Sequence, residues 1–172
     1  PANATTATVV RFDLAHTFEQ VLKIIEQVDP NAKQQFETQL AQAEPQLGFS
    51  LKTDLLAALG DEWTIYSSGT EAGVAFIPGL VLTANVRDHA KLNKAHETLV
   101  MLAKATVAQM GPQAAFSIQD FAARGEKGYR IQFNGIPVPV APTLVLTKEQ
   151  LIVGLTPQLV TGPFAAAGKA SL

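Results

Sequence analysis

Two stretches rich in β-branched residues each lead to an aspartate, and helical spacing of apolar residues begins directly after each aspartate. The first stretch covers residues 5–13, and the second covers residues 79–84 ahead of Asp88. β-branched residues favour strands, and an aspartate side chain can accept hydrogen bonds from the free N–H groups of a helix start. The chain therefore predicts a strand, a capped helix and further strands, twice in succession.

The helices are predicted from apolar spacing and from stop signals. After Asp13, apolar residues recur at helical intervals until the Asp29-Pro30 pair, and a second helix is expected over residues 31–43. A short helix capped by Thr53 or Asp54 should end at Gly60. The longest helix is predicted from Asp88 to about residue 110, where glycine and proline follow, and a final short helix begins near residue 156.

Strands are predicted over residues 63–66, 74–77, 79–84, 116–123, 129–133, 143–147 and 151–155. Pro78 indicates a bulge or a sheet edge, and residues 134–142, with three prolines, should be an extended connection. We expect an α+β fold whose antiparallel or mixed sheet carries helices packed on one face. Its arrangement would be ferredoxin-like with additions, and half-repeats at 5–68 and 79–164 would reflect an internal duplication.

Composition limits the class of protein. Of 172 residues, 47% are hydrophobic and 16% are charged, so one domain with a packed core is expected. A net charge of −2 gives no basic field for nucleic acid, and no apolar run of about 18 residues is present to span a bilayer. The chain begins at Pro1 without a leader pattern, which predicts a processed protein or a fragment of a longer chain.

The most site-like cluster lies in residues 47–68, where Asp61 and Glu62 precede Trp63, the only tryptophan. Two carboxylates beside an aromatic ring suit a cation, a sugar or acid–base chemistry. Neighbouring residues on a strand point to opposite faces, however, so convergence would need help from Asp54. Ligand binding at Asp54, Asp61, Glu62 and Trp63 is the site hypothesis, and a turn that places Trp63 in the core is the structural alternative.

Other chemistry has little support in the residue pattern. His89 and His96 lie two helical turns apart, which is too far for one metal ion, and the serines fit no nucleophile motif. The chain contains no cysteine, so it has no thiolate nucleophile and no disulfide. We predict no catalytic residue, no metal site and no cofactor.

Residues 47–66, with the pattern Leu-Gly-Asp-Glu before a strand, resemble a bacterial family of exported proteins of unknown function. Residues 141–158 are similar to the closing hairpin and helix of the same family. The resemblance covers about a third of the chain and implies a periplasmic or cell-surface bacterial protein with repeated units. It brings no catalytic residues.

Three functions follow as hypotheses. The first is an extracytoplasmic scaffold or protein-interaction domain without catalytic activity, which should show an exposed apolar patch or an unpaired sheet edge, expected near residues 134–142. The second is a metal-assisted hydrolase that uses Asp54, Asp61 and Glu62. The third is a module that binds a small apolar or lipid ligand.

Overall fold

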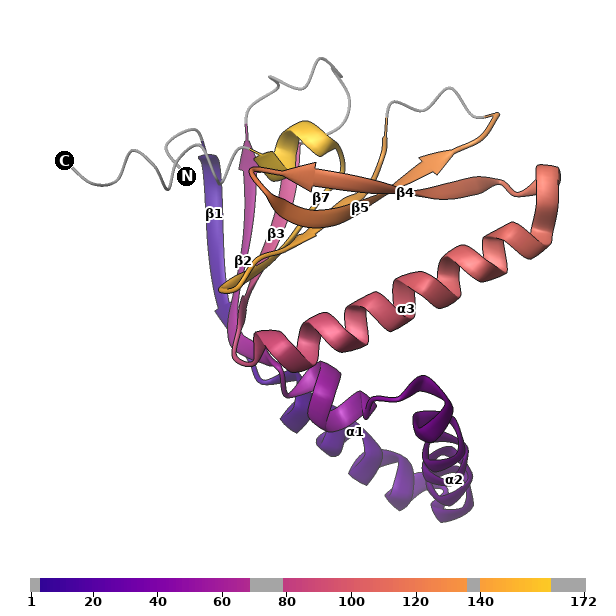
Figure 1. Cartoon of the computed structure of the whole chain (residues 1–172). Coiled ribbons are helices and arrows are strands. Elements are labelled where there is room, and N and C mark those ends of the chain that lie inside the picture. Colours follow the sequence, from indigo (N-terminus) through magenta and orange to yellow (C-terminus); the bar gives the residue numbers. More distant parts are fainter. Residues whose placement is uncertain (1–3, 69–78, 136–139, 162–172) are drawn as a thin grey trace.

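A single antiparallel sheet of seven strands organises the molecule (Figure 1). The computed structural model describes residues 4–68, 79–135 and 140–161. The strands are β1 (Ala4–Arg11), β2 (Leu59–Ser68), β3 (Gly79–Val86), β4 (Phe116–Ala123), β5 (Glu126–Phe133), β6 (Thr143–Leu146) and β7 (Gln150–Gly154). Their order in the sheet is β1-β2-β3-β7-β6-β5-β4, and every pairing is antiparallel. The predicted α+β class is confirmed.

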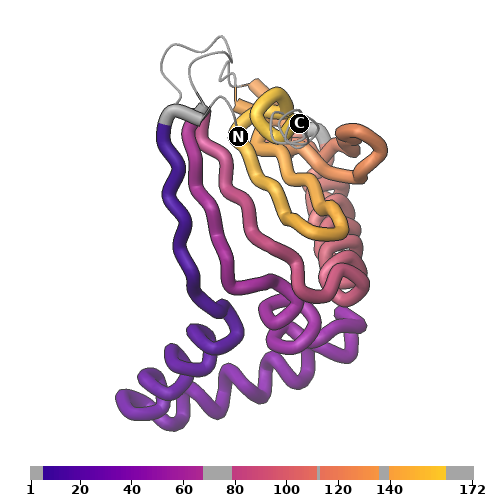
Figure 2. The backbone as a smooth tube through the Cα atoms, turned by 90° about the vertical axis from the view of Figure 1, so that its left-hand side faces the viewer, coloured from indigo at the N-terminus to yellow at the C-terminus, as the bar shows by residue number. Residues whose placement is uncertain are grey.

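The helices occupy two places relative to this sheet. They are α1 (Leu14–Val28), α2 (Pro30–Leu47), η1 (Leu51–Leu56), α3 (His89–Met110) and η2 (Gly111–Gln113). The α1–α2 hairpin extends from one end of the sheet, while α3 crosses one face and leads into β4 (Figures 1 and 2). Among the described residues, no helix has both the length and the apolarity needed to cross a membrane.

Both predicted aspartate caps are confirmed. Asp13 accepts a hydrogen bond from the backbone N–H of His16 at 2.9 Å, and Asp88 accepts one from Lys91 at 3.1 Å. Each aspartate is in an extended conformation and satisfies an N–H group that the first helical turn cannot satisfy. The long helix ends at Gly111, as predicted.

The second helix is longer than the predicted 31–43, because it continues through Pro45 to Leu47. A proline removes one helical hydrogen bond, and near the end of a helix this loss does not stop the chain from continuing. The helix ends instead at Gly48, which adopts the left-handed conformation (φ 71°) and donates its N–H to the carbonyl of Glu44 at 2.8 Å.

The prediction that Gly60 stops a short helix was wrong. The π-helical turn η1 ends at Leu56, its N-cap is Ser50 rather than Thr53 or Asp54, and Gly60 lies inside β2. A Cβ atom at position 60 would overlap the side chain of Asn85. Glycine is therefore present for a close approach between strands, which a helix-stop pattern cannot distinguish.

The β4–β5 connection is tighter than the predicted five-residue loop. Only Arg124 and Gly125 separate the strands, and both have positive φ, 52° and 87°. Two left-handed residues match the right-handed twist of a hairpin, which lets β5 begin at Glu126.

Two hydrophobic cores lie on opposite faces of the sheet. Val145 belongs to the core that also holds Val81, Ile152 and Val160, whereas its neighbour Leu146 belongs to the core that contacts α3 through Leu92. Adjacent strand residues point to opposite faces, so the sheet is covered on both sides over its central strands. Residues 157–161 are helical and supply Val160 to the first core.

The strand order gives the ferredoxin-like and duplication details no support. β1 and β2, which flank the α1–α2 hairpin, are neighbours, whereas β3 and β4, which flank α3, are separated by β7, β6 and β5. The expected strand at residues 74–77 and Pro78 lie outside the described residues.

Candidate functional site

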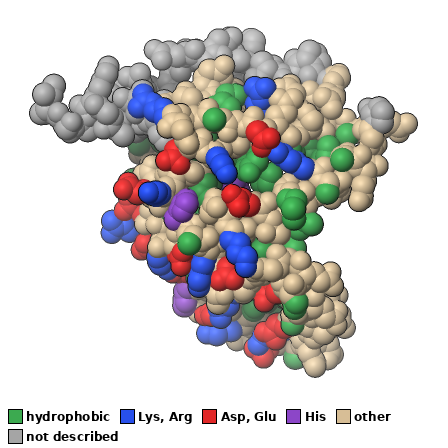
Figure 3. Space-filling view, viewed as in Figure 1, with side chains coloured by type: hydrophobic (Ala, Val, Ile, Leu, Met, Phe, Trp, Pro, Cys, Tyr) green, Lys and Arg blue, Asp and Glu red, His purple; other side chains and the backbone are tan. Residues whose placement is uncertain are grey.

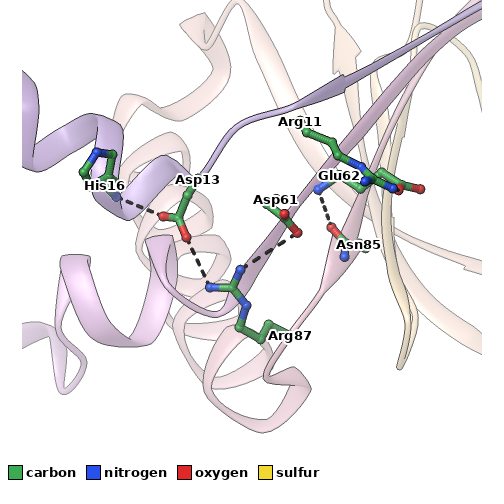
Figure 4. A network of polar contacts seen from close by, with 7 residues as sticks. All are labelled: Arg11, Asp13, His16, Asp61, Glu62, Asn85 and Arg87. Atoms are coloured by element: carbon green, nitrogen blue, oxygen red, sulfur yellow. Dashed lines mark hydrogen bonds and ion pairs between the residues drawn. The ribbon is translucent and has the colours of Figure 1, made fainter.

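Arg87 joins the strand end of β3 to the start of α1 and to β2 (Figure 4). Its guanidinium lies 3.3 Å from a carboxylate oxygen of Asp13 and 4.0 Å from one of Asp61. The backbone N–H of His16, and secondly Arg87, lower the pKa of Asp13 below its usual value. The aspartate is thus ionised at neutral pH and serves as a helix cap and an ion-pair partner.

Glu62 belongs to a second, separate contact group. Its carboxylate pairs with Arg11 of β1 at 2.9 Å, and its backbone N–H donates to the side-chain oxygen of Asn85 at 2.9 Å. Figure 4 shows Glu62 beside Arg11, while Asp61 points toward Arg87. The two adjacent carboxylates therefore diverge, as the alternation of strand residues requires.

Asp54 lies in η1 and has its own partners. One carboxylate oxygen accepts the backbone N–H of Ser50 at 2.9 Å, and the other lies 3.4 Å from the ammonium group of Lys91. The Ser50 hydrogen bond, followed in importance by Lys91, lowers the pKa of Asp54. These contacts connect η1 to α3, and a second ion pair, between Lys52 and Glu19, connects η1 to α1.

The ring of Trp63 packs against other side chains and is not available to stack on a ligand. It stacks on Phe12 with ring centroids 5.2 Å apart and contributes to the core on the α3 side of the sheet. Its indole N–H has no hydrogen-bond partner among the described residues. The ring is held between β1 and the core, which matches the structural alternative raised from the sequence.

The structure does not bring the four candidate residues together around one ligand. Asp54, Asp61 and Glu62 each face a different cation: Lys91, Arg87 and Arg11. Within residues 4–68, 79–135 and 140–161, no group of three or more acidic or histidine side chains is placed to hold a metal ion. What the arrangement can do chemically is orient the helical hairpin against the sheet.

The histidines do not form a metal-ligand pair. His96 packs edge-on against Tyr129, with ring centroids 5.1 Å apart, and its burial between α3 and the sheet lowers the pKa of its imidazole. His16 lies exposed at the start of α1, where its ring is 3.3 Å from the amide of Gln20. The apolar neighbours Leu92 and Leu99 in the sequence predict a partly buried histidine at position 96 of the long helix, and His96 is partly buried.

A different feature, the open edge at β1, was not singled out from the sequence. β1 ends the sheet order, and no other described strand lies on its outer side (Figure 2). Residues 6–10 are all exposed, including Val9 at 57% and Val10 at 44%. The sequence contained one signal for an open edge: the first seven residues of this strand are uncharged, and Arg11 at its end is the only charged one.

The backbone groups that β1 turns outward can be assigned from its pairing with β2. Phe12 donates its N–H to the carbonyl of Asp61 at 2.8 Å, and the register Val10↔Trp63 and Thr8↔Ile65 continues from it. Hydrogen-bonded residues alternate along an antiparallel strand, so even-numbered residues bond to β2. The N–H and C=O groups of Ala7, Val9 and Arg11 consequently face away from the sheet.

The opposite edge of the sheet is protected differently. β4 carries Asp120 in its middle, ion-paired with Lys104 of α3 at 2.7 Å, and α3 contacts this strand. Charged side chains and a covering helix are the usual means by which proteins prevent strand addition. β1 has neither between Thr6 and Val10.

Searches against protein-family models, curated proteins and solved structures found no match to this chain. The resemblance to a family of exported bacterial proteins stays a prediction.

Proposed function

We propose that this chain is an extracytoplasmic scaffold or protein-interaction domain without catalytic activity, and that it binds an extended protein segment at the edge of β1. The observation that carries the proposal is an exposed edge strand that has no charge, proline or glycine from Thr6 to Val10. The extracytoplasmic location is supported by the family resemblance, and the absence of cysteine is compatible with it.

Strand addition explains the chemistry of this edge. Outward N–H and C=O groups of alternating residues form the hydrogen bonds that give affinity, and side chains on the two faces give specificity. Val9 lies on one face of the edge and Val10 on the other, so an added strand gains apolar contacts on both sides. On the Val10 face the apolar surface extends to Ile65 of β2, which is 43% exposed.

Exposed apolar residues also occur on the helices, but they specify a partner less closely. Val21, Ile24 and Val28 form a stripe on α1, and Leu99, Leu102 and Met110 reach the surface of α3. Hydrophobic side chains are visible at the surface toward the notch between α3 and α2 (Figure 3). A helix face has no free backbone groups, so these surfaces do not indicate which kind of segment covers them.

The prediction that the interaction surface lies at residues 134–142 has less support. Pro142 accepts the backbone N–H of Ile131 at 2.8 Å, and Ala141 donates to the carbonyl of Leu155 at 3.0 Å. This part of the connection is thus paired with the sheet, and residues 136–139 lie outside the described residues.

A selection of displayed peptides tests the proposal. A library of random nine-residue peptides would be selected on the wild-type chain and then measured on Val9→Pro, which removes an outward N–H and leaves the β2 hydrogen bonds in place. Val9→Thr is the matched control because it keeps both the N–H group and the branched side chain. The proposal predicts peptides that bind wild type and Val9→Thr and lose affinity for Val9→Pro. Peptides that bind all three chains equally would contradict it, as would a selection that enriches none.

The two alternative functions have weaker support. A metal-assisted hydrolase would need Asp54, Asp61 and Glu62 at one ion, and each has a separate cationic partner. The measurement is the melting temperature with and without calcium or zinc, and a rise would favour that function. A groove along α2 of about 380 Å³ is lined by Gln34, Gln35, Thr38, Gln39 and Gln42. Its amide and hydroxyl lining is the wrong chemistry for an apolar or lipid ligand.

A further inference from the structure

We infer that the partner at this edge is a second copy of the same chain, joined by antiparallel pairing of β1 with β1 about a two-fold axis. The inference rests on the proposed function and adds the identity of the partner. Three properties of β1 carry it: the phase of its outward backbone groups, the position of its one charge, and the exposure of its side chains on both faces.

The phase of the outward groups limits the register. Two antiparallel copies form one continuous sheet only when the residues that pair with each other point to the same face. The two-fold axis must therefore pass midway between the two copies of one residue. The pairing with β2 shifts between Ala4 and Thr6, so the outward phase is established for residues 6–11. With the axis at Thr8, the outward residues Ala7 and Val9 form two hydrogen-bonded pairs across the interface, and both pairs are uncharged. An axis at Ala7 forms one such pair, and an axis at Val9 places Arg11 opposite Ala7 of the other copy.

The side chains agree with the same register. In it Val9 lies opposite Ala7 on one face, and Val10 lies opposite Thr6 on the other, so each exposed valine gains a small partner. Thr8 lies opposite its own copy on the axis, where two threonines form a favourable cross-strand pair. No glycine or proline interrupts the paired segment.

Charge favours antiparallel self-pairing over parallel self-pairing. Arg11, the only charged residue of β1, is at the end of the strand and is 2.9 Å from Glu62 of its own chain. Antiparallel pairing puts the two Arg11 side chains at opposite ends of the interface. Parallel pairing in register would put them side by side, where like charges repel.

Self-association can be measured with the chain of 172 residues. Sedimentation equilibrium should show a monomer–dimer equilibrium for wild type and for Val9→Thr. Val9→Pro should weaken it by roughly tenfold or more, because each copy loses an inter-chain hydrogen bond. A wild-type chain that stays monomeric at millimolar concentration would overturn the inference, and so would equal dimerisation of all three chains.

A cross-linking experiment does not depend on the folding of the proline variant. Because the chain has no cysteine, Thr8→Cys adds a single thiol on the proposed axis. The two Cα atoms of a non-hydrogen-bonded pair are about 4.5 Å apart, which a disulfide can span. Val10→Cys, on the same face, would place its two copies about 13 Å apart, which a disulfide cannot span.

Oxidation should therefore yield a covalent dimer for Thr8→Cys and little for Val10→Cys. Equal cross-linking of both variants would show random collision and would contradict the register. If library peptides bind at β1 in a Val9→Pro-sensitive way but the chain does not self-associate, the interaction function stands and the second-copy inference fails. If neither occurs, both fail.

Discussion

Tyr66 carries the most quantitative prediction about this fold. Its ring is 4% exposed in the core formed by Val81, Ile152 and Val160, and its hydroxyl has no hydrogen-bond partner among the described residues. Burial raises the pKa of the Tyr66 phenol from its ordinary value of 10.0 to about 12. The fold thus holds a neutral hydroxyl that does not ionise easily and that forms no hydrogen bond with the described part of the chain.

Tyr66→Phe removes this hydroxyl and keeps the ring. At pH 7 the variant should be as stable as wild type, or more stable by about 1 kcal/mol, because an unsatisfied buried group is removed. Loss of a hydroxyl that had a partner would instead cost about 1 kcal/mol. Urea unfolding of both chains at pH 7 separates these outcomes.

The pH dependence has a defined sign. The pKa of the phenol is higher in the folded than in the unfolded state, so the unfolded chain loses its proton first and stability falls as pH rises above 10. By pH 12 wild type should have lost about 2 kcal/mol relative to Tyr66→Phe. Parallel stability curves for the two chains between pH 9 and pH 12 would refute the burial of this hydroxyl, as would a clear loss of stability in Tyr66→Phe at pH 7.

Three further predictions concern other parts of the fold. Gly128→Ala should destabilise the chain by about 2 kcal/mol in urea unfolding, because a Cβ there would overlap the backbone carbonyl of Leu144 in the neighbouring strand. A Gly128→Ala variant as stable as wild type would contradict the β5–β6 register. Asp13→Ala should lower the melting temperature more than Asp61→Ala, since Asp13 is both a helix cap and an ion-pair partner, and equal effects would argue against the cap. The pKa of His96 is lowered by burial, so wild type should lose stability relative to His96→Phe as pH falls below 6.5, and pH-independent differences would show that the imidazole is solvated.

Local signals in the sequence predicted local structure well. Residues close together in the sequence were enough to predict the Asp13 and Asp88 caps, the end of α3 at Gly111 and the positions of most strands. The errors arose where a segment distant in the sequence determines the local conformation. Gly60 looks like a helix stop, but it lies in β2, where a Cβ atom would overlap the side chain of Asn85, 25 residues further on.

The candidate site shows the same division. Adjacency placed Asp61, Glu62 and Trp63 together in the sequence, and strand alternation correctly predicted that the two carboxylates diverge. Their cations, Arg87 and Arg11, come from other elements and could not be paired from spacing alone. The position of β1 at the edge depends on the order of all seven strands, which no local pattern encodes.

Amide hydrogen exchange along β1, measured residue by residue by NMR at low and high protein concentration, tests the central claim most directly. The amides of Thr8 and Val10 bond to β2 and should exchange slowly at both concentrations. The outward amides of Ala7 and Val9 should exchange rapidly at low concentration and become protected at high concentration. Rapid exchange of Ala7 and Val9 at every concentration would contradict pairing of β1 with a second copy.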